Sequence, residues 1–416
     1  MLALALLLPL QGTQLVPSDL HAAKEFGTSV AIDGSTLVVG SVRDMPDAQF
    51  DHGSAYVFDL DTGQELFELL PDVIGPSMDA FGQAVDVSGT VAVVGASRGQ
   101  DLGTNAGAAY LFDVTTGNEL RKLLPADGVA NDRFGFSVAI EGSLVLVGSY
   151  LDDDLGAGSG SAYLFEASTG AQLHKFVASD GAGGDNFGQA VALAGGLALV
   201  GAPGDDDLGG GSGAVYVFDT FSGAELRKLV PNDGNAGAAF GRAVTASGDL
   251  ALIGAHTDDD NGAASGSAYL FTPSTGQQRL KLLPDDGAAN DRFGWAVGLG
   301  GGVALVGAWR DLGDSPGVEE GSAYFFDASS GAQLSKVSNF GPPRAERFGY
   351  AVAVGGTWSA VGAPMESVNL ESTAGAVWRY ATRSVVGVPL GSGLALGVQG
   401  LVLAMAGAWC ARRRRV

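Results

Sequence analysis

The dipeptide Phe-Gly recurs seven times in phase along this chain, with 53 or 55 residues between successive copies. A constant period of this length is typical of repeat architectures, in which each repeat packs only on its neighbours. The period therefore constrains the fold of most of the chain before any single residue is considered. The copies begin at Phe26, Phe81, Phe134, Phe187, Phe240, Phe293 and Phe348.

Each repeat contains four expected strands and no segment with a sustained helical period. The representative copy places them at 134–140, 144–148, 161–165 and 172–177. The second strand is an unbroken apolar run, as expected for a strand buried on both faces. The third carries aromatic residues two apart, on one face of the strand. The fourth is the most polar.

Four antiparallel strands in about 50 residues match the size of a propeller blade, whereas a solenoid coil needs only about 20–30 residues. The polar fourth strand suits the outer edge of a blade. The sequence therefore predicts an all-β fold, a seven-bladed β-propeller of four-stranded antiparallel blades.

The two ends of the repeat region predict how the ring closes. The last repeat supplies only three strands, whereas residues 14–19 match the fourth-strand ending 122–127 in sequence and register. We expect this N-terminal strand to complete the seventh blade, because closure removes two exposed sheet edges. The predicted propeller domain spans residues 11–383.

The chain resembles FG-GAP repeat proteins, since Gly201-Ala202-Pro203 and Gly362-Ala363-Pro364 follow their Phe-Gly pairs. That family includes the seven-bladed head of integrin α-subunits, which binds ligand together with a partner subunit and carries calcium loops of Asp-x-Asp-x-Asp-Gly type. Here the link between the first two strands is a bare turn such as Glu141-Gly142-Ser143. The integrin calcium sites therefore do not carry over, and the resemblance is greater to bacterial FG-GAP proteins with short first turns.

The composition is strongly acidic, with 46 Asp and Glu against 23 Lys and Arg and a net charge of −23. Such a surface repels nucleic acid and argues against that class of partner. It favours solubility, divalent cations and basic partners.

The acidic residues gather on the connectors that follow the second strands. In an up-and-down blade, these connectors and the links between blades emerge on the same side of the disc, so that side is the predicted binding face. Trp309 and Arg310 replace the Pro-Gly of an equivalent connector and resemble a binding hot spot, with local packing as the alternative. The candidate ligand-binding residues are Asp152, Asp153, Asp154, Asp205, Asp206, Asp207, Asp258, Asp259, Asp260, Trp309 and Arg310.

The aspartate triplets have two interpretations. Calcium takes six to eight oxygen ligands, and Asp205, Asp206 and Asp207 are the candidate metal ligands if neighbouring connectors contribute. Alternatively, the triplets are solvated, turn-forming loops that oppose aggregation. No cofactor other than Ca²⁺ is indicated.

Signals for enzymatic chemistry are weak. The four histidines do not have metal-ligand spacing, and the matches to Gly-x-Ser-x-Gly at 95–99 and 313–317 are not followed by a helical pattern. Paired carboxylates for glycoside cleavage stay an alternative, because many aspartates share one face. We expect a protein that is not an enzyme.

The ends of the chain predict export and attachment to a membrane. Residues 1–10 resemble the apolar core of a signal peptide. Residues 384–410 are free of charge and long enough to cross a bilayer, and four arginines within 411–416 predict a cytoplasmic C-terminus. This layout is similar to that of bacterial C-terminal sorting tails. The propeller would then lie outside the cell.

The leading hypothesis is a membrane-anchored, cell-surface propeller that binds or adheres to an extracellular protein or glycan through its acidic loop face. A secreted carbohydrate-active lyase or hydrolase using the same face is the second hypothesis. A structural envelope protein without a specific ligand is the third.

Overall fold

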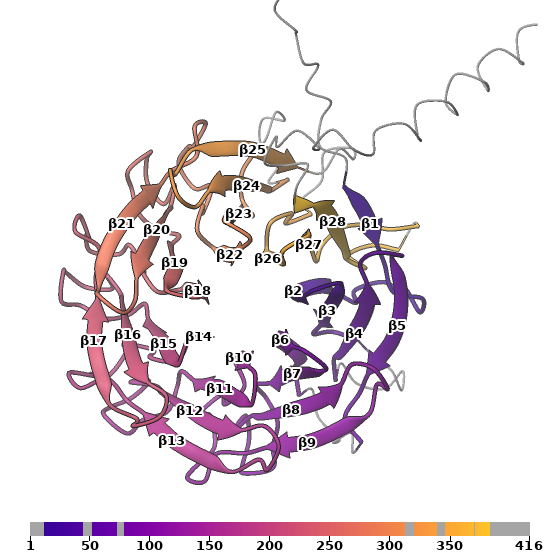
Figure 1. Ribbon diagram of the computed structural model, residues 1–416, viewed down its shortest axis with the longest axis horizontal. Coiled ribbons are helices and arrows are strands. Elements are labelled where there is room, and N and C mark those ends of the chain that lie inside the picture. The colour runs from indigo at the N-terminus through magenta and orange to yellow at the C-terminus, as the bar shows by residue number, and fades with distance from the viewer. Residues whose placement is uncertain are drawn as a thin grey trace, which may run out of the picture.

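The computed structural model describes residues 12–44, 52–72, 79–312, 320–338, 346–369 and 371–382. These residues form seven antiparallel sheets of four strands each, arranged around a common axis (Figure 1). The predicted seven-bladed propeller is confirmed. Within each blade the first strand is innermost and the fourth lies at the rim (Figure 1).

The strands follow the blades in chain order. Blades one and two contain β2 (Phe26–Asp33), β3 (Thr36–Ser41), β4 (Ser54–Asp59), β5 (Gln64–Leu69), β6 (Phe81–Ser88), β7 (Val91–Ala96), β8 (Ala108–Asp113) and β9 (Glu119–Leu123). Blades three and four contain β10 (Ser137–Glu141), β11 (Leu144–Ser149), β12 (Ser161–Glu166), β13 (Gln172–Phe176), β14 (Ala190–Ala194), β15 (Leu197–Ala202), β16 (Ala214–Asp219) and β17 (Glu225–Leu229). Blades five and six contain β18 (Ala243–Ser247), β19 (Leu250–Ala255), β20 (Ser267–Thr272), β21 (Gln277–Leu282), β22 (Ala296–Gly300), β23 (Val303–Ala308), β24 (Ser322–Asp327) and β25 (Gln333–Ser338). Blade seven contains β26 (Ala351–Val354), β27 (Trp358–Ala363), β28 (Ala376–Ala381) and β1 (Thr13–Leu15).

The hydrophobic core is divided among the interfaces between blades. Each of the seven hydrophobic clusters formed by described residues joins two adjacent blades. The second and third strands are buried on both faces, as β15 and β16 show, whereas the fourth strand β17 is half exposed. This is why the second strands have continuous apolar sequences and the fourth strands alternate.

The Phe-Gly pair lies at the interface between consecutive blades. The Phe134 ring is buried and meets the rings of Tyr163 and Phe165 edge-on, with centroids 5.5 and 5.9 Å apart. Its N–H donates to the carbonyl of Ala106 in the preceding blade at 2.9 Å. The sequence predicted a strand starting at Phe134, but β10 starts only at Ser137, because the Phe-Gly backbone turns aside to contact that neighbour.

Glycine is required where two blades approach most closely. Gly201 lies at the start of the Gly-Ala-Pro segment of blade four, and a Cβ there would lie 2.0 Å from the carbonyl oxygen of Gly241 in blade five. Equivalent close approaches recur at the other six interfaces, including that of Gly362 with Gly27, where blade seven meets blade one. The two motifs that give the repeat its pattern therefore contact each other across every interface.

The ring closes as the sequence predicted. Strand β1 pairs antiparallel with β28, with Gln14 opposite Trp378 and Leu15 opposite Val377. Leu15 and Phe26 pack with Ala360 and Val377 in a cluster that joins blades seven and one. The last interface thus has a core like those of the other six.

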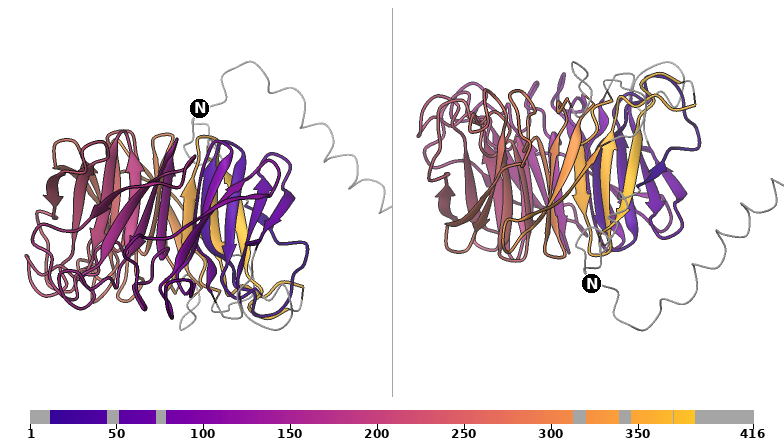
Figure 2. Two further views of the ribbon diagram at one scale, coloured as in Figure 1. Left: turned by 90° about the horizontal axis from the view of Figure 1, so that it is seen from below. Right: turned by 90° about the horizontal axis from the view of Figure 1, so that it is seen from above.

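The disc has two unlike faces, which Figure 2 shows edge-on with the strands running across its thickness. One face carries the connectors between second and third strands together with the links between blades. These two connector types meet there, since the Asn186 N–H donates to the carbonyl of Gly158 at 3.0 Å. We call this the long-connector face. The opposite face carries tight turns such as Glu141–Leu144 and Asp219–Gly223.

The predicted terminal segments lie outside the described residues. These are the signal-like segment 1–10, the apolar segment 384–410 and the arginine-rich tail 411–416. Within the described ranges, no helix is both long and apolar enough to cross a membrane.

Replacing Gly201 with alanine should destabilise the propeller by about 3 kcal/mol, because the new methyl group overlaps backbone of the next blade. Gly210→Ala in the same blade is the matched control, since a Cβ there meets nothing within 4 Å. Urea denaturation of both variants measures the difference. Equal stabilities for the two would contradict a steric requirement for glycine at the interface.

Candidate functional site

Blades three to six carry the same ionic cluster near the rim of the long-connector face. In blade four, Lys228 Nζ lies 2.9 Å from Asp180 Oδ2 and 2.7 Å from Asp205 Oδ2, and it also pairs with Asp207. The ammonium lies 5.1 Å from the ring centroid of Tyr216, whose hydroxyl donates to Asp205 at 2.7 Å. One lysine therefore forms ion pairs with three carboxylates that come from two connectors.

We call these groups the rim clusters, and their members recur at equivalent positions. They are Lys175 with Tyr163, Asp127, Asp152 and Asp154; Lys228 with Tyr216, Asp180, Asp205 and Asp207; Lys281 with Tyr269, Asp233, Asp258 and Asp260; and Lys336 with Tyr324, Asp286 and Asp311.

The blade architecture positions each member of a rim cluster. Tyr216 on β16 lies opposite Lys228 on β17, so both side chains are on one face of the sheet. Burial alone would lower the pKa of Lys228, but hydrogen bonds to Asp205, Asp207 and Asp180 raise it above its ordinary value. Burial raises the pKa of Asp180, and donors from Tyr216 and Lys228 outweigh this and lower it. Both partners therefore stay charged at neutral pH.

The predicted aspartate triplets divide into three structural environments. The first members, Asp152, Asp205 and Asp258, are buried. The third members, Asp154, Asp207 and Asp260, pair with the cluster lysines. The middle members, Asp153, Asp206 and Asp259, are exposed.

This arrangement bears on the calcium hypothesis. A calcium ion at Asp205, Asp206 and Asp207 would compete with the Lys228 ammonium, which already contacts two of the three carboxylates. The middle residues also have a local role, since Asp259 accepts the backbone N–H of Ala264 at 2.7 Å. A role of the triplets in ligand or metal binding stays a prediction.

In blade one the positions of the acidic and basic residues of the rim cluster are exchanged. Glu68 lies opposite Tyr56, where blades two to six have lysine, and the cation comes instead from Lys24, whose side chain is fully buried. Lys24 Nζ lies 2.7 Å from both Asp19 Oδ2 and Asp44 Oδ2. Lysine stands here two residues before Phe-Gly, where blades three, four and six have Asp132, Asp185 and Asp291.

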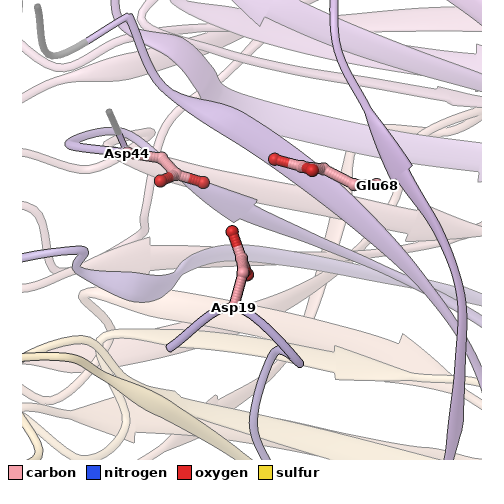
Figure 3. Close-up of side chains that lie close together, drawn as sticks. All are labelled: Asp19, Asp44 and Glu68. Carbon is pink, nitrogen blue, oxygen red and sulfur yellow. The ribbon is translucent and has the colours of Figure 1, made fainter. Parts of the chain in front are cut away.

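Figure 3 shows Asp19, Asp44 and Glu68 converging in blade one, with one oxygen of each carboxyl group within 4.8 Å of the others. Such a group could hold a metal ion by geometry, but Lys24 already supplies the positive charge. Burial raises the pKa of Asp44, whereas Lys24 and the hydroxyls of Ser54 and Tyr56 lower it to about 2. Burial and Asp19 raise the pKa of Glu68. The group is therefore best explained as a structural ion-pair network.

The remaining two blades retain parts of the rim cluster. In blade two, Gly99 takes the place of the buried aspartate, and Lys122 pairs with Asp101. In blade seven, Gln14 Nε2 and Trp378 Nε1 donate to the two carboxylate oxygens of Glu366 at 2.6 and 2.8 Å. The N-terminal strand therefore joins blade seven through side chains as well as backbone.

A second group of residues surrounds the mouth of the axial channel on the long-connector face. The residue that follows each Phe-Gly pair contributes there to a pocket of about 250 Å³, which we call the axial pocket. These residues are small or neutral polar in blades one, two and four, but large or cationic in blades three, five, six and seven. They are Thr28, Gln83, Phe136, Gln189, Arg242, Trp295 and Tyr350.

Aromatic rings from three neighbouring blades meet beside the axial pocket. The Trp295 ring centroid lies 5.1 Å from that of His256 and 5.5 Å from those of Trp309 and Tyr350. Trp309 is half-buried, and its indole N–H has no hydrogen-bond partner among the described residues. The predicted hot-spot residue Trp309 therefore packs within this group and keeps part of its surface accessible.

Arginines surround the same rings. The guanidinium of Arg242 lies 4.6 Å from the centroid of Trp295, and those of Arg347 and Arg310 lie 5.0 and 5.3 Å from the centroid of Trp309. Arg310, the other predicted hot-spot residue, thus belongs to this group. The mouth of the channel is a cationic, aromatic patch in an acidic protein.

Burial and the concentration of positive charge lower the pKa values of basic groups in this patch. Burial lowers the pKa of Arg242. Burial, Arg242 and Arg292 together lower the pKa of His256 to about 3, so this imidazole is neutral at physiological pH. Burial and the nearby Arg310 also lower the pKa of Arg292.

Prediction from the sequence included Trp309 and Arg310 but missed Arg242, Trp295 and Tyr350. A signal was present, because these residues occupy positions where blades two and four have glutamine. The rim lysines were also missed, although lysine recurs at a fixed place in five fourth strands.

Comparison with known families agrees with the geometry. A family described as the FG-GAP repeat matches residues 10–58, 75–112, 118–165, 171–218, 224–271 and 277–326. These segments cover more than half of the chain. No curated protein matches it.

Lys24→Asp should destabilise the protein by about 4 kcal/mol at pH 7, because it removes the buried cation from three carboxylates and adds a fourth. Glu68→Lys in the same chain should restore most of this loss by recreating the arrangement of the other blades. Urea unfolding of the two single variants and the double variant measures the coupling.

The stabilising effect of Lys24 should also depend on pH. Ion pairing holds the pKa of Asp44 at about 2, below its ordinary value, so this contribution is complete above about pH 4 and is lost as pH falls toward 2. Additive effects of Lys24→Asp and Glu68→Lys, or a stability difference that does not shrink in acid, would contradict the exchanged-charge interpretation.

Proposed function

Because the chain belongs to the FG-GAP repeat family of β-propeller binding modules, we propose that it binds an extracellular ligand through its long-connector face. The ligand is a protein or a glycan, and the proposed role is binding or adhesion without catalysis. The face combines long loops with a rigid scaffold, an arrangement on which binding sites are commonly built.

One observation carries this proposal, namely that the strongest departures from the repeat gather at one place. Residues needed only to build blades recur from blade to blade, as the rim clusters do. Arg242, Trp295, Trp309 and Tyr350 do not recur, yet they come together beside the axial pocket. Half-exposed tryptophan and arginine are the residue types that dominate binding hot spots.

The rim clusters support a structural role for much of the acidic charge. Their lysines bind the first and third aspartates of each triplet, so these carboxylates already have a cationic partner. The proposed ligand contacts therefore centre on the inner part of the face, with exposed Asp153, Asp206 and Asp259 at its outer edge. The proposal does not require a divalent cation.

Attachment to a membrane with the propeller outside the cell is part of the proposal. Its support is the charge-free segment 384–410 and the four arginines that follow. β28 ends at Ala381, so the segment follows the last blade directly.

Screening the full chain against glycan and extracellular-protein arrays tests the binding role. Hydrogen exchange on the complex with any ligand found should show protection of connectors 203–213 and 256–266, because both lie on the long-connector face. The turns at 220–224 and 273–277 on the opposite face are the internal control. Protection confined to those turns, or no ligand on any array, would count against the proposal.

Deleting residues 384–410 should move the expressed protein from the membrane fraction to the soluble fraction, if this segment is the anchor. Replacing Arg412, Arg413, Arg414 and Arg415 by alanine is the control that leaves the apolar segment intact, and it should leave the protein in the membrane fraction. A full-length chain found only in the soluble fraction would contradict anchoring.

A further inference from the structure

We propose that the axial pocket binds a ring-shaped ligand carrying a carboxylate, the chemistry of a uronic acid residue of an acidic glycan. This inference rests on the proposed function and names the ligand class for the same face. It follows from an uncompensated cation, accessible aromatic rings and polar side chains that line a single pocket.

Arg242 supplies the argument for a negative charge. Its half-buried side chain lines the axial pocket and stacks on Trp295, but it forms no ion pair or hydrogen bond with a described residue. Removing a guanidinium from water without a counter-ion is unfavourable, and a carboxylate held by two parallel N–H···O bonds offsets that cost. Arg292 and Arg347 add positive charge nearby.

The walls of the axial pocket supply the argument for a ring. Trp295 and Tyr350 line the pocket on the side of blades six and seven, next to Arg242 of blade five. Aromatic rings of this kind pack well against a flat face built of C–H groups, as one face of a pyranose is. A carboxylate on that ring would lie close to the arginine.

The other side of the axial pocket is polar except at Phe136 of blade three. Thr28, Gln83 and Gln189 line it from blades one, two and four. Their hydroxyl and amide groups donate and accept hydrogen bonds, as a sugar with several hydroxyl groups requires. The pocket therefore offers separate partners for the carboxylate, the apolar ring face and the hydroxyls of one residue.

The size of the axial pocket limits the ligand further. Its volume of about 250 Å³ is smaller than that of pockets for drug-sized molecules, which span roughly 300–1,000 Å³. The axial pocket therefore accommodates a single sugar ring, and a second cavity of about 300 Å³ adjoins it along the channel and shares Val30, Val138 and Val297 with it. The rest of a glycan chain would leave along the long-connector face. The exposed aspartates there would repel further acidic residues, so a terminal uronate or an alternating polymer fits better than a polyuronate.

Calorimetric titration of the full chain with glucuronate and galacturonate, with glucose and galactose as neutral counterparts, tests this inference. Arg242→Gln and Trp295→Gln are the informative variants, because blades two and four carry glutamine at the same position. Arg279→Gln, an exposed arginine on β21 in the same blade as Arg242, is the matched control. Unchanged melting temperatures establish that the variants fold.

We expect the uronates to bind and the neutral sugars to bind at least tenfold more weakly. Arg242→Gln should weaken uronate binding at least tenfold, the loss expected for one charge-assisted pair, and Arg279→Gln should leave it unchanged. Trp295→Gln should weaken neutral sugars and should weaken uronates at least as much, because it removes the stacking surface and also the ring on which the Arg242 guanidinium lies.

Several outcomes would overturn the inference. Uronate affinity that Arg242→Gln leaves intact would place the carboxylate elsewhere, and equal binding of benzoate would show that the site does not select a sugar. Absence of uronate binding at about 10 mM, together with an array ligand that protects the long-connector face, would overturn this inference and leave the proposed function standing. A ligand that protects only the opposite face would contradict both this inference and the proposed function.

Discussion

Contact between glycine backbones of adjacent blades is the constraint on which the ring depends. Near the axis, Gly201 and Gly241 bring two blades so close that a methyl group does not fit between them. Farther out, Phe240 and Tyr269 of blade five pack in the hydrophobic cluster that lies between the same two blades and holds them apart. A blade that is thin inside and thick outside is a wedge, and seven such wedges complete a circle. The repeated glycine and aromatic residues therefore set how thick each blade is near the axis and near the rim.

Charge in this protein has separate roles at the rim and at the axis. At the rim, lysine and tyrosine hold aspartates from two connectors, and blade one reaches the same balance with Lys24 and Glu68 in exchanged positions. Such exchange indicates that contact between opposite charges matters more than which strand supplies the cation. At the axis, Arg242 stacks on Trp295 without an ion pair to a described residue. The net charge of −23 thus conceals a local surface of opposite sign.

Much of the fold could be predicted from the sequence, because period, turn residues and strand polarity are local properties. The number of blades and the closing strand at Gln14 and Leu15 are confirmed. The rim clusters could not be predicted in the same way, because their members are far apart in the sequence. Lys228 and Asp180 are 48 residues apart, and only the pairing of the strands brings them into contact. Predicting the residues around the axial pocket would have required a comparison of the residue that follows each Phe-Gly pair in all seven repeats. Residue type alone identified Trp309 as a candidate, but its neighbours come from other blades.

Closure by the first strand has a consequence for the order of folding. Gln14 and Glu366, joined by a hydrogen bond, are 352 residues apart, so the bond cannot form during synthesis until nearly the whole propeller has emerged. Until then Leu15 and Phe26 lack their partners Ala360 and Val377 in blade seven, and a growing chain exposes an unpaired edge. Pairing over so long a separation is slow, and the same edge could recruit another copy of the chain. Chaperones that shield the early blades would favour closure within one molecule over exchange between two.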